Sequence, residues 1–119
     1  MKTNDIAQRL VALCRAGKFE EAQKELFADN VVSIESRPSP AFERETKGLA
    51  AIIEKGHKFQ SMIEKLFELT VSDPLVAGDS IACTMSMDVK MKGQDRMKMS
   101  EVCVYEVKDE KIISEQFHM

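Results

Sequence analysis

The sequence predicts an α+β fold in which helices come first and antiparallel strands follow. Apart from one short strand, apolar residues recur every three or four positions as far as residue 62, and at every second position after it. Helical and strand-like patterns that are separated along the chain are typical of α+β domains and not of doubly wound parallel sheets. The 119 residues, of which 44% are apolar, suffice for a single core, so residues 1–119 are expected to form one domain.

Two short helices are predicted at the start of the chain. The first follows from an apolar stripe at helical spacing, formed by Ile6, Leu10, Leu13 and Cys14. Residues 3–5 offer N-cap side chains, and Gly17 ends the helix because glycine readily adopts positive φ. A second helix fits residues 18–27 and is interrupted by Asp29-Asn30.

A strand, a loop and a third helix are expected next. Residues 31–35 alternate between apolar and polar side chains, which predicts a short strand. Pro38 and Pro40 then interrupt regular structure, because each lacks an N–H donor and restricts the residue before it, so a loop is expected as far as Lys47. Gly48 to Met62 is predicted to be helical, with one face made of Leu49, Ile52, Ile53, Gly56 and Phe59.

The second half of the chain predicts a run of strands. Their expected ranges are 63–72, 75–77, 80–92, 97–107 and 111–119, with turns at 93–95 and 109–110. One face of the strand 80–92 carries Ile81, Cys83, Met85, Met87, Val89 and Met91. One face of the strand 97–107 carries Met97, Met99, Glu101, Cys103, Tyr105 and Val107. We expect one face of these strands to pack on the helices and the other to contact a second subunit.

Composition and motifs exclude several classes of protein. The 17 basic and 20 acidic residues give a net charge of −3, which argues against a nucleic-acid-binding domain. No apolar run approaches the roughly 20 residues of a membrane span, and no signal-peptide core opens the chain, so a cytoplasmic location is expected. The cysteines form no CxxC pair and the histidines no HxxxH pair, which predicts reduced thiols and no metal site. Glycine-rich phosphate or dinucleotide motifs are absent, so no cofactor is expected.

Three stretches of the chain carry a family resemblance. They are GKFEEAQKELFADNV (Gly17–Val31), KGLAAIIEKG (Lys47–Gly56) and VYEVKDEKIISEQF (Val104–Phe117). In this order they resemble the SnoaL-like polyketide cyclases and ketosteroid isomerases, which share the nuclear transport factor 2-like, or cystatin-like, fold. The resemblance covers almost the whole chain, although Glu110 stands where the family usually has a glycine.

The resemblance implies a cone, in which a curved antiparallel sheet wraps around the three helices and encloses a mostly apolar pocket. It also implies acid and base residues on strands inside that pocket, and a homodimer formed through the outer face of the sheet. Glu35 falls where the isomerases have a general-base aspartate, but Leu10 and Cys103 stand in place of their oxyanion donors. Phe117 and Glu115 fall near the catalytic aspartate and the pocket histidine of the cyclases.

Three glutamates are the candidate catalytic residues. Glu35, Glu101 and Glu115 fall on strand faces that the alternation turns inward. A carboxyl group on an apolar face is costly unless it is paired, neutral or hydrated, and several such groups together raise at least one pKa. A group poised in this way can act as an acid or a base. The competing interpretation is that one or two of these side chains face solvent or pair with nearby basic residues.

Apolar side chains are expected to complete the pocket. Methionine is flexible and adapts to ligands of varied shape, so methionines in the middle of the hairpin are candidate ligand contacts. Met91 and Met97, near the hairpin tip, are more readily explained as core or interface. His57 lies one position off the apolar stripe of the third helix and is expected either at the pocket mouth or on the surface. The predicted substrate-binding residues are Met85, Met87, Met99, Phe59, Tyr105, Phe117 and His57.

Three functions are compatible with the sequence. An enzyme of the SnoaL-like type would move protons on a small apolar carbonyl compound without a cofactor, with Glu35 or Glu115 as the base and the other, or Glu101, as its acidic partner. A non-catalytic module would hold a small hydrophobic molecule with one polar anchor. A dimerisation module would fill the pocket with its own side chains. The direction in which the three carboxylates point distinguishes these functions.

Overall fold

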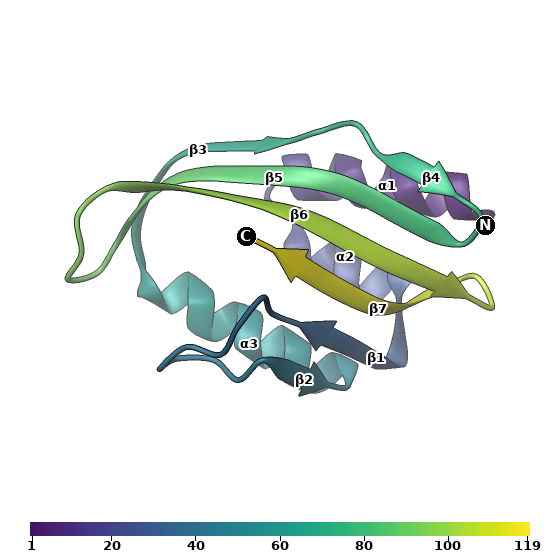
Figure 1. Ribbon diagram of the computed structural model, residues 1–119, viewed down its shortest axis with the longest axis horizontal. Coiled ribbons are helices and arrows are strands. Elements are labelled where there is room, and N and C mark those ends of the chain that lie inside the picture. The colour runs from purple at the N-terminus through teal and green to yellow at the C-terminus, as the bar shows by residue number, and fades with distance from the viewer.

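Three helices and a seven-stranded curved sheet make up the fold, as seen in a computed structural model that describes residues 1–119 (Figure 1). The helices are α1 (Thr3–Arg15), α2 (Phe19–Leu26) and α3 (Leu49–Met62). The strands are β1 (Phe27–Ile34), β2 (Glu45–Lys47), β3 (Ile63–Val71), β4 (Leu75–Ala77), β5 (Ser80–Met91), β6 (Met97–Lys108) and β7 (Lys111–His118). The predicted α+β class is confirmed, and so is the order of helices and strands apart from the additional strand β2. None of the helices has both the length and the apolar character needed to cross a bilayer.

The sheet is mixed, with the strand order β2-β1-β7-β6-β5-β3 and with β4 paired to β5. Strands β3 to β7 pair in antiparallel fashion, as predicted, but β1 runs parallel to β7. The expectation of a wholly antiparallel sheet is corrected at this one pair. Strands β1 and β7 are far apart in the sequence, so no tight hairpin turn forces them to run in opposite directions.

The first strand begins four residues earlier than the alternation predicts. Phe27 ends the expected second helix, but in the structure it opens β1 and pairs with Ile112 of β7. The register shifts between Phe27 and Val32, so a bulge accommodates the polar Asp29-Asn30. A pairing between distant residues therefore overrides the local turn signal. The short strand β2, expected as loop, adds to β1 because Ser33 pairs with Thr46.

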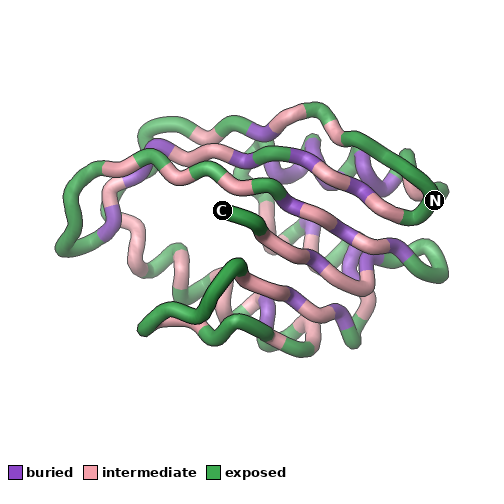
Figure 2. Tube along the Cα trace, viewed as in Figure 1, coloured by how far each residue is buried: buried purple, intermediate pink, exposed green.

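Fully buried isoleucines join the helices to the sheet. Ile6 of α1, Ile52 of α3, Ile81 of β5 and Ile112 of β7 are each at most 1% exposed. Burying one such side chain contributes roughly 1.5–3 kcal/mol to stability. Buried residues run along the part of the sheet that is backed by α1 and α2, whereas the end of the β5–β6 hairpin is largely exposed or half-buried (Figure 2). The core thus fills one half of the molecule more completely than the other.

A tight turn and a register shift together set the pairing of β6 with β7 at the site. Asp109 and Glu110 both have positive φ, of 51° and 63°, as a two-residue hairpin turn of type I′ requires. The turn predicted at these residues is confirmed, and Glu110 adopts the conformation without being a glycine. The register then shifts between Glu106 and Val107, and the pairing beyond this irregularity places Tyr105 directly opposite Glu115.

Candidate functional site

A cavity of about 460 Å³ lies between the helices and the concave face of the sheet. Its lining is mostly apolar and includes side chains from all three helices, from β5, β6 and β7, and from the segment that follows β1. The structure brings all three candidate glutamates to this cavity, namely Glu35, Glu101 and Glu115. Six of the seven predicted substrate-binding residues also line it: Met85, Met87, Met99, Phe59, Tyr105 and Phe117.

Strand register determines which side chains meet at the polar end of the cavity. Glu115 on β7 lies between Tyr105 of β6 and Ser33 of β1, each its direct cross-strand partner. Partners of this kind have Cβ atoms roughly 5 Å apart and project on the same face. Glu101 lies further along β6, opposite Met85 of β5. Three separate pairings therefore converge on one inward face.

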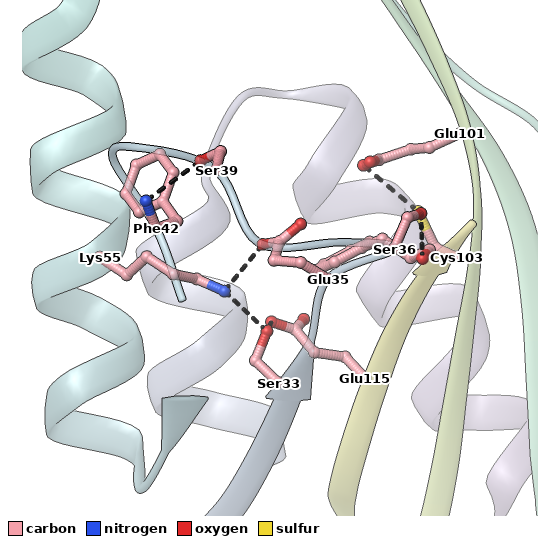
Figure 3. Close-up of polar contacts among 10 residues, drawn as sticks. Ser33, Glu35, Ser36, Ser39, Phe42, Lys55, Glu101, Cys103 and Glu115 are labelled. Atoms are coloured by element: carbon pink, nitrogen blue, oxygen red, sulfur yellow. Dashed lines mark hydrogen bonds and ion pairs between the residues drawn. The ribbon is translucent and has the colours of Figure 1, made fainter. Parts of the chain in front are cut away.

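A chain of hydrogen bonds links α3 to two of the glutamates (Figure 3). The Lys55 ammonium donates to Glu35 Oε1 and to Ser33 Oγ, both at 2.9 Å. The Ser33 hydroxyl lies 2.8 Å from Glu115 Oε1 and donates to it. The Lys55 side chain is only 15% exposed and that of Glu35 27%, so this ion pair is partly shielded from water. Glu35 is thereby held as a charged partner of Lys55.

Glu115 is the most deeply buried of the three carboxyl groups. The residue is 5% exposed, and burial raises the pKa of its carboxyl group from 4.5 to about 7. The hydrogen bond from Ser33 and the charge of Lys55 oppose this rise, while the charges of Glu35 and Glu101 add to it. A carboxyl group with this pKa exchanges its proton in the physiological range.

Glu101 enters the cavity from β6 on the other side of the site (Figure 3). Burial again raises its pKa to about 7, with a further contribution from the charge of Glu35. Its one side-chain hydrogen-bond partner is the Cys103 thiol, which donates to Oε1 at 3.7 Å. A thiol is a weak donor. The Glu101 carboxylate is therefore less fully satisfied than that of Glu35.

Two carboxyl groups of similar pKa beside one ammonium can both supply and remove a proton. At pH 7, Glu101 and Glu115 together hold roughly one proton, because each titrates near that pH. One of them can then accept a proton while the other donates a hydrogen bond. The competing interpretation holds in part, because Glu35 pairs with the basic residue Lys55, but all three side chains line the cavity.

Lys55 is the main site residue that the sequence analysis missed. A signal was present, because Lys55 lies three residues after Ile52 and four before Phe59, on the apolar face of α3. A lysine within an apolar helical stripe indicates a buried partner of opposite charge. Phe42 was also missed. It lines the cavity from the loop after β1, and its ring centroid lies 6.5 Å from that of Phe59.

His57 is the one predicted substrate-binding residue that the structure places away from the cavity. Its ring lies on the outer side of α3, where it contacts Glu20 of α2 and Glu54 of its own helix. The hydrogen bond with Glu20 raises the pKa of the imidazole. One position along a helix is a rotation of about 100°, which carries His57 from the apolar stripe to the solvent side. The alternative surface position is the one adopted.

Methionines supply much of the remaining lining of the cavity. Of the eight methionines in the chain, all but Met1 line it: Met62, Met85, Met87, Met91, Met97, Met99 and Met119. Met91 and Met97, which the sequence favours as core or interface residues, also border the cavity. The reason is that the β5–β6 hairpin extends past the core, so its inward side chains face the cavity as far as the tip.

A curved sheet that encloses an apolar cavity with inward carboxyl groups defines a class of small α+β pocket proteins with the cystatin-like fold. The family model for the SnoaL-like domain matches residues 1–119. The protein therefore belongs to the SnoaL-like domain family, as the resemblance predicted. A search of curated proteins found no match.

Solved structures have the same fold. A candidate SnoaL-like polyketide cyclase from Mesorhizobium loti is 29% identical, with a TM-score of 0.93 and 100% of both chains covered. TerC, co-crystallised with polyporic acid, is 14% identical, with a TM-score of 0.77 over 99% of this chain and 92% of that one. A protein from Catenulispora acidiphila with a ketosteroid isomerase-like fold, in complex with trimethylamine, is 20% identical, with a TM-score of 0.68 over 96% of this chain and 84% of that one.

Proposed function

We propose that the protein is an acid–base enzyme that moves a proton on a small apolar carbonyl compound bound in the cavity. The single observation that carries the proposal is the convergence of three carboxyl groups on one apolar cavity, two of them with a pKa of about 7. The reaction class needs a base near a C–H bond and a donor near the carbonyl oxygen, and these residues supply both without a cofactor.

The roles of the glutamates follow from their partners. Glu35 is committed to Lys55, so it is a poorer base than the sequence hypothesis supposed. Ionised Glu101, with only a thiol partner, takes the proton from the carbon beside the carbonyl group. Protonated Glu115 donates a hydrogen bond to the carbonyl oxygen, on which negative charge develops as the enolate forms. Return of the proton from Glu101 to a different carbon of a conjugated enolate restores the carbonyl group and completes an isomerisation.

A ligand-binding module without catalysis is the second candidate. It is favoured by the volume and apolar lining of the cavity, which fall in the range of small-molecule sites. Two neighbours of the same fold are complexes with small molecules, polyporic acid and trimethylamine. A module whose pocket is filled by its own side chains is disfavoured by the open cavity.

Deuterium exchange tests proton transfer without knowledge of the natural substrate. A panel of small cyclic ketones of increasing size is incubated with the protein in D₂O, and loss of the protons beside the carbonyl group is followed by NMR. Glu101→Gln is expected to slow exchange by about 10²–10⁴-fold, as loss of a general base does. Glu45→Gln, on the exposed strand β2, is the matched control. It should catalyse proton exchange on the ketones at the same rate as the unmodified protein.

The pH profile and the binding data separate the two candidates. Exchange should be greatest near pH 7, where Glu101 and Glu115 share one proton, and should fall on either side. Equal exchange rates for Glu101→Gln and the unmodified protein would remove Glu101 from the mechanism. Background exchange for every ketone, together with saturable binding of the same ketones, would favour the binding module.

A further inference from the structure

Ser33 is buried behind the cavity and has no place in the proposed reaction so far. It is 0% exposed and does not border the cavity, but its hydroxyl lies between Lys55 and Glu115. A hydroxyl in this position, fully buried among charged groups, is constrained in how it can orient its single proton.

The direction of the Ser33 proton is fixed by its two neighbours. The lysine ammonium has three donors and no acceptor, so Ser33 Oγ must accept from Lys55. The serine has one proton, and Glu115 Oε1 is the remaining partner within hydrogen-bond distance. Ser33 therefore donates to Oε1, and the order of donation runs from Lys55 to Ser33 to Glu115.

This order determines which oxygen of Glu115 preferentially carries a proton. Oε1 accepts the hydroxyl proton of Ser33, and the carbonyl oxygen of a protonated carboxyl group is a better acceptor than its hydroxyl oxygen, so the carboxyl proton is favoured on Oε2. Every fully buried side-chain oxygen in the protein has a hydrogen-bond partner. Glu115 Oε2 has no hydrogen-bond partner in the protein, so it is not fully buried and must be open to the cavity that Glu115 lines. The acidic proton of Glu115 consequently resides on the oxygen that a ligand can reach.

We infer that Ser33 is a positioning residue, which holds Glu115 through Oε1 and keeps its exchangeable proton on Oε2, facing the cavity. The inference rests on the proposed function for its catalytic meaning, since a proton on Oε2 is the one offered to a carbonyl oxygen. The parallel pairing of β1 with β7 makes it possible, because that pairing sets Ser33 directly beside Glu115. Without Lys55, the hydroxyl of Ser33 could reverse and accept a proton from Oε1.

Titration of Glu115 tests this role without any substrate. The protein is labelled with ¹³C at the glutamate carboxyl carbons, and the Glu115 signal is identified by its loss in Glu115→Gln. Ser33→Ala removes a donor that favours the carboxylate, so the midpoint of Glu115 should rise by at least about one pH unit. Ser33→Thr keeps the hydroxyl and should restore the midpoint. Ser86→Ala, which removes a hydroxyl bonded to Ser100 elsewhere in the sheet, is the matched control and should leave the midpoint unchanged.

A second variant keeps the test independent of how well Ser33→Ala folds. Ser33→Cys nearly preserves the side-chain volume and replaces the hydroxyl by a weaker donor, so a smaller rise is expected. Unchanged midpoints in Ser33→Ala and Ser33→Cys, with both variants folded by circular dichroism, would overturn the role of Ser33. A different outcome is that the midpoints shift as expected while the unmodified protein catalyses no proton exchange on any ketone. In that case Ser33 positions Glu115 as inferred, and the proposed acid–base activity is wrong.

Discussion

The two ends of the cavity are built on opposite physical principles. At the carboxylate end, Glu35, Lys55, Ser33 and Glu115 are joined by hydrogen bonds of 2.8–2.9 Å between buried or partly buried groups. At the methionine end, toward the tip of the β5–β6 hairpin, the lining is mostly unbranched thioether side chains, and its polar residues Gln94 and Ser100 make no hydrogen bond to the carboxylate end. The first end fixes atoms in place, and the second can change shape.

This difference assigns separate tasks to the two ends. Proton transfer needs donors and acceptors held within a few tenths of an ångström, which a buried hydrogen-bonded chain provides. Accommodation of an apolar body needs only contact area, which flexible methionines supply for several shapes. Changes at the carboxylate end should therefore alter chemistry and pH dependence, whereas changes at the methionine end should alter only which ligands fit.

The largest effect is expected on stability as a function of pH. Between pH 4.5 and 7, an unfolded chain ionises the Glu101 and Glu115 carboxyl groups while the folded protein keeps them protonated, so stability falls as the pH rises through this window. The pKa difference corresponds to about 3 kcal/mol for each group. The free energy of unfolding of Glu101→Gln, measured with urea, should therefore lack the decrease that Glu101 causes in the unmodified protein. Its difference from the unmodified protein should grow by about 3 kcal/mol in favour of the variant from pH 4.5 to pH 8.

Glu45→Gln provides the control for this measurement, because the Glu45 side chain is 47% exposed. Its unfolding free energy should follow that of the unmodified protein at every pH. A parallel pH dependence for Glu101→Gln and the unmodified protein would mean that Glu101 is not strained by burial, and the contrast between the two ends of the cavity would weaken.

The next largest effect is a loss of stability in Lys55→Met. This substitution removes the donor to Glu35 and Ser33 and the positive charge that lowers the pKa of both Glu101 and Glu115. At pH 8 the unfolding free energy should fall by about 1–3 kcal/mol, the cost of leaving buried polar groups unpaired. The loss should be smaller at pH 5, where the two buried carboxyl groups are neutral. An equal loss at both pH values would show that Lys55 contributes packing and not charge.

The smallest effect is expected at the methionine end. The double substitution Met87→Leu with Met99→Leu preserves volume and should cost less than about 1.5 kcal/mol. Branched leucine adapts less than methionine, so the range of apolar fluorescent probes that bind should narrow, while exchange with the smallest ketone stays unchanged. Ketone exchange that falls in step with probe binding would show that the two ends do not act separately.

Much of the site was predictable because side-chain alternation is a local property. A residue on a strand faces the same way as its neighbours two positions away, so Glu101 and Glu115 could be assigned to the inner face from the sequence. His57 was less certain, since one helical position decides between cavity and surface. The position of Lys55 was also predictable from the sequence, because it lies at helical spacing between Ile52 and Phe59 on the apolar stripe of α3.

The sequence by itself determined the order of helices and strands, the inward faces of the long strands and the presence of carboxyl groups on them, because these features depend on periodicity within a few residues. Only the tertiary structure decided that β1 lies parallel to β7, and hence that Ser33 meets Glu115 across 82 residues of sequence. It also decided that Lys55 pairs with Glu35 and that the cavity stays open. Such outcomes depend on which distant segments pair and how completely the core fills, and no local pattern of side chains encodes either.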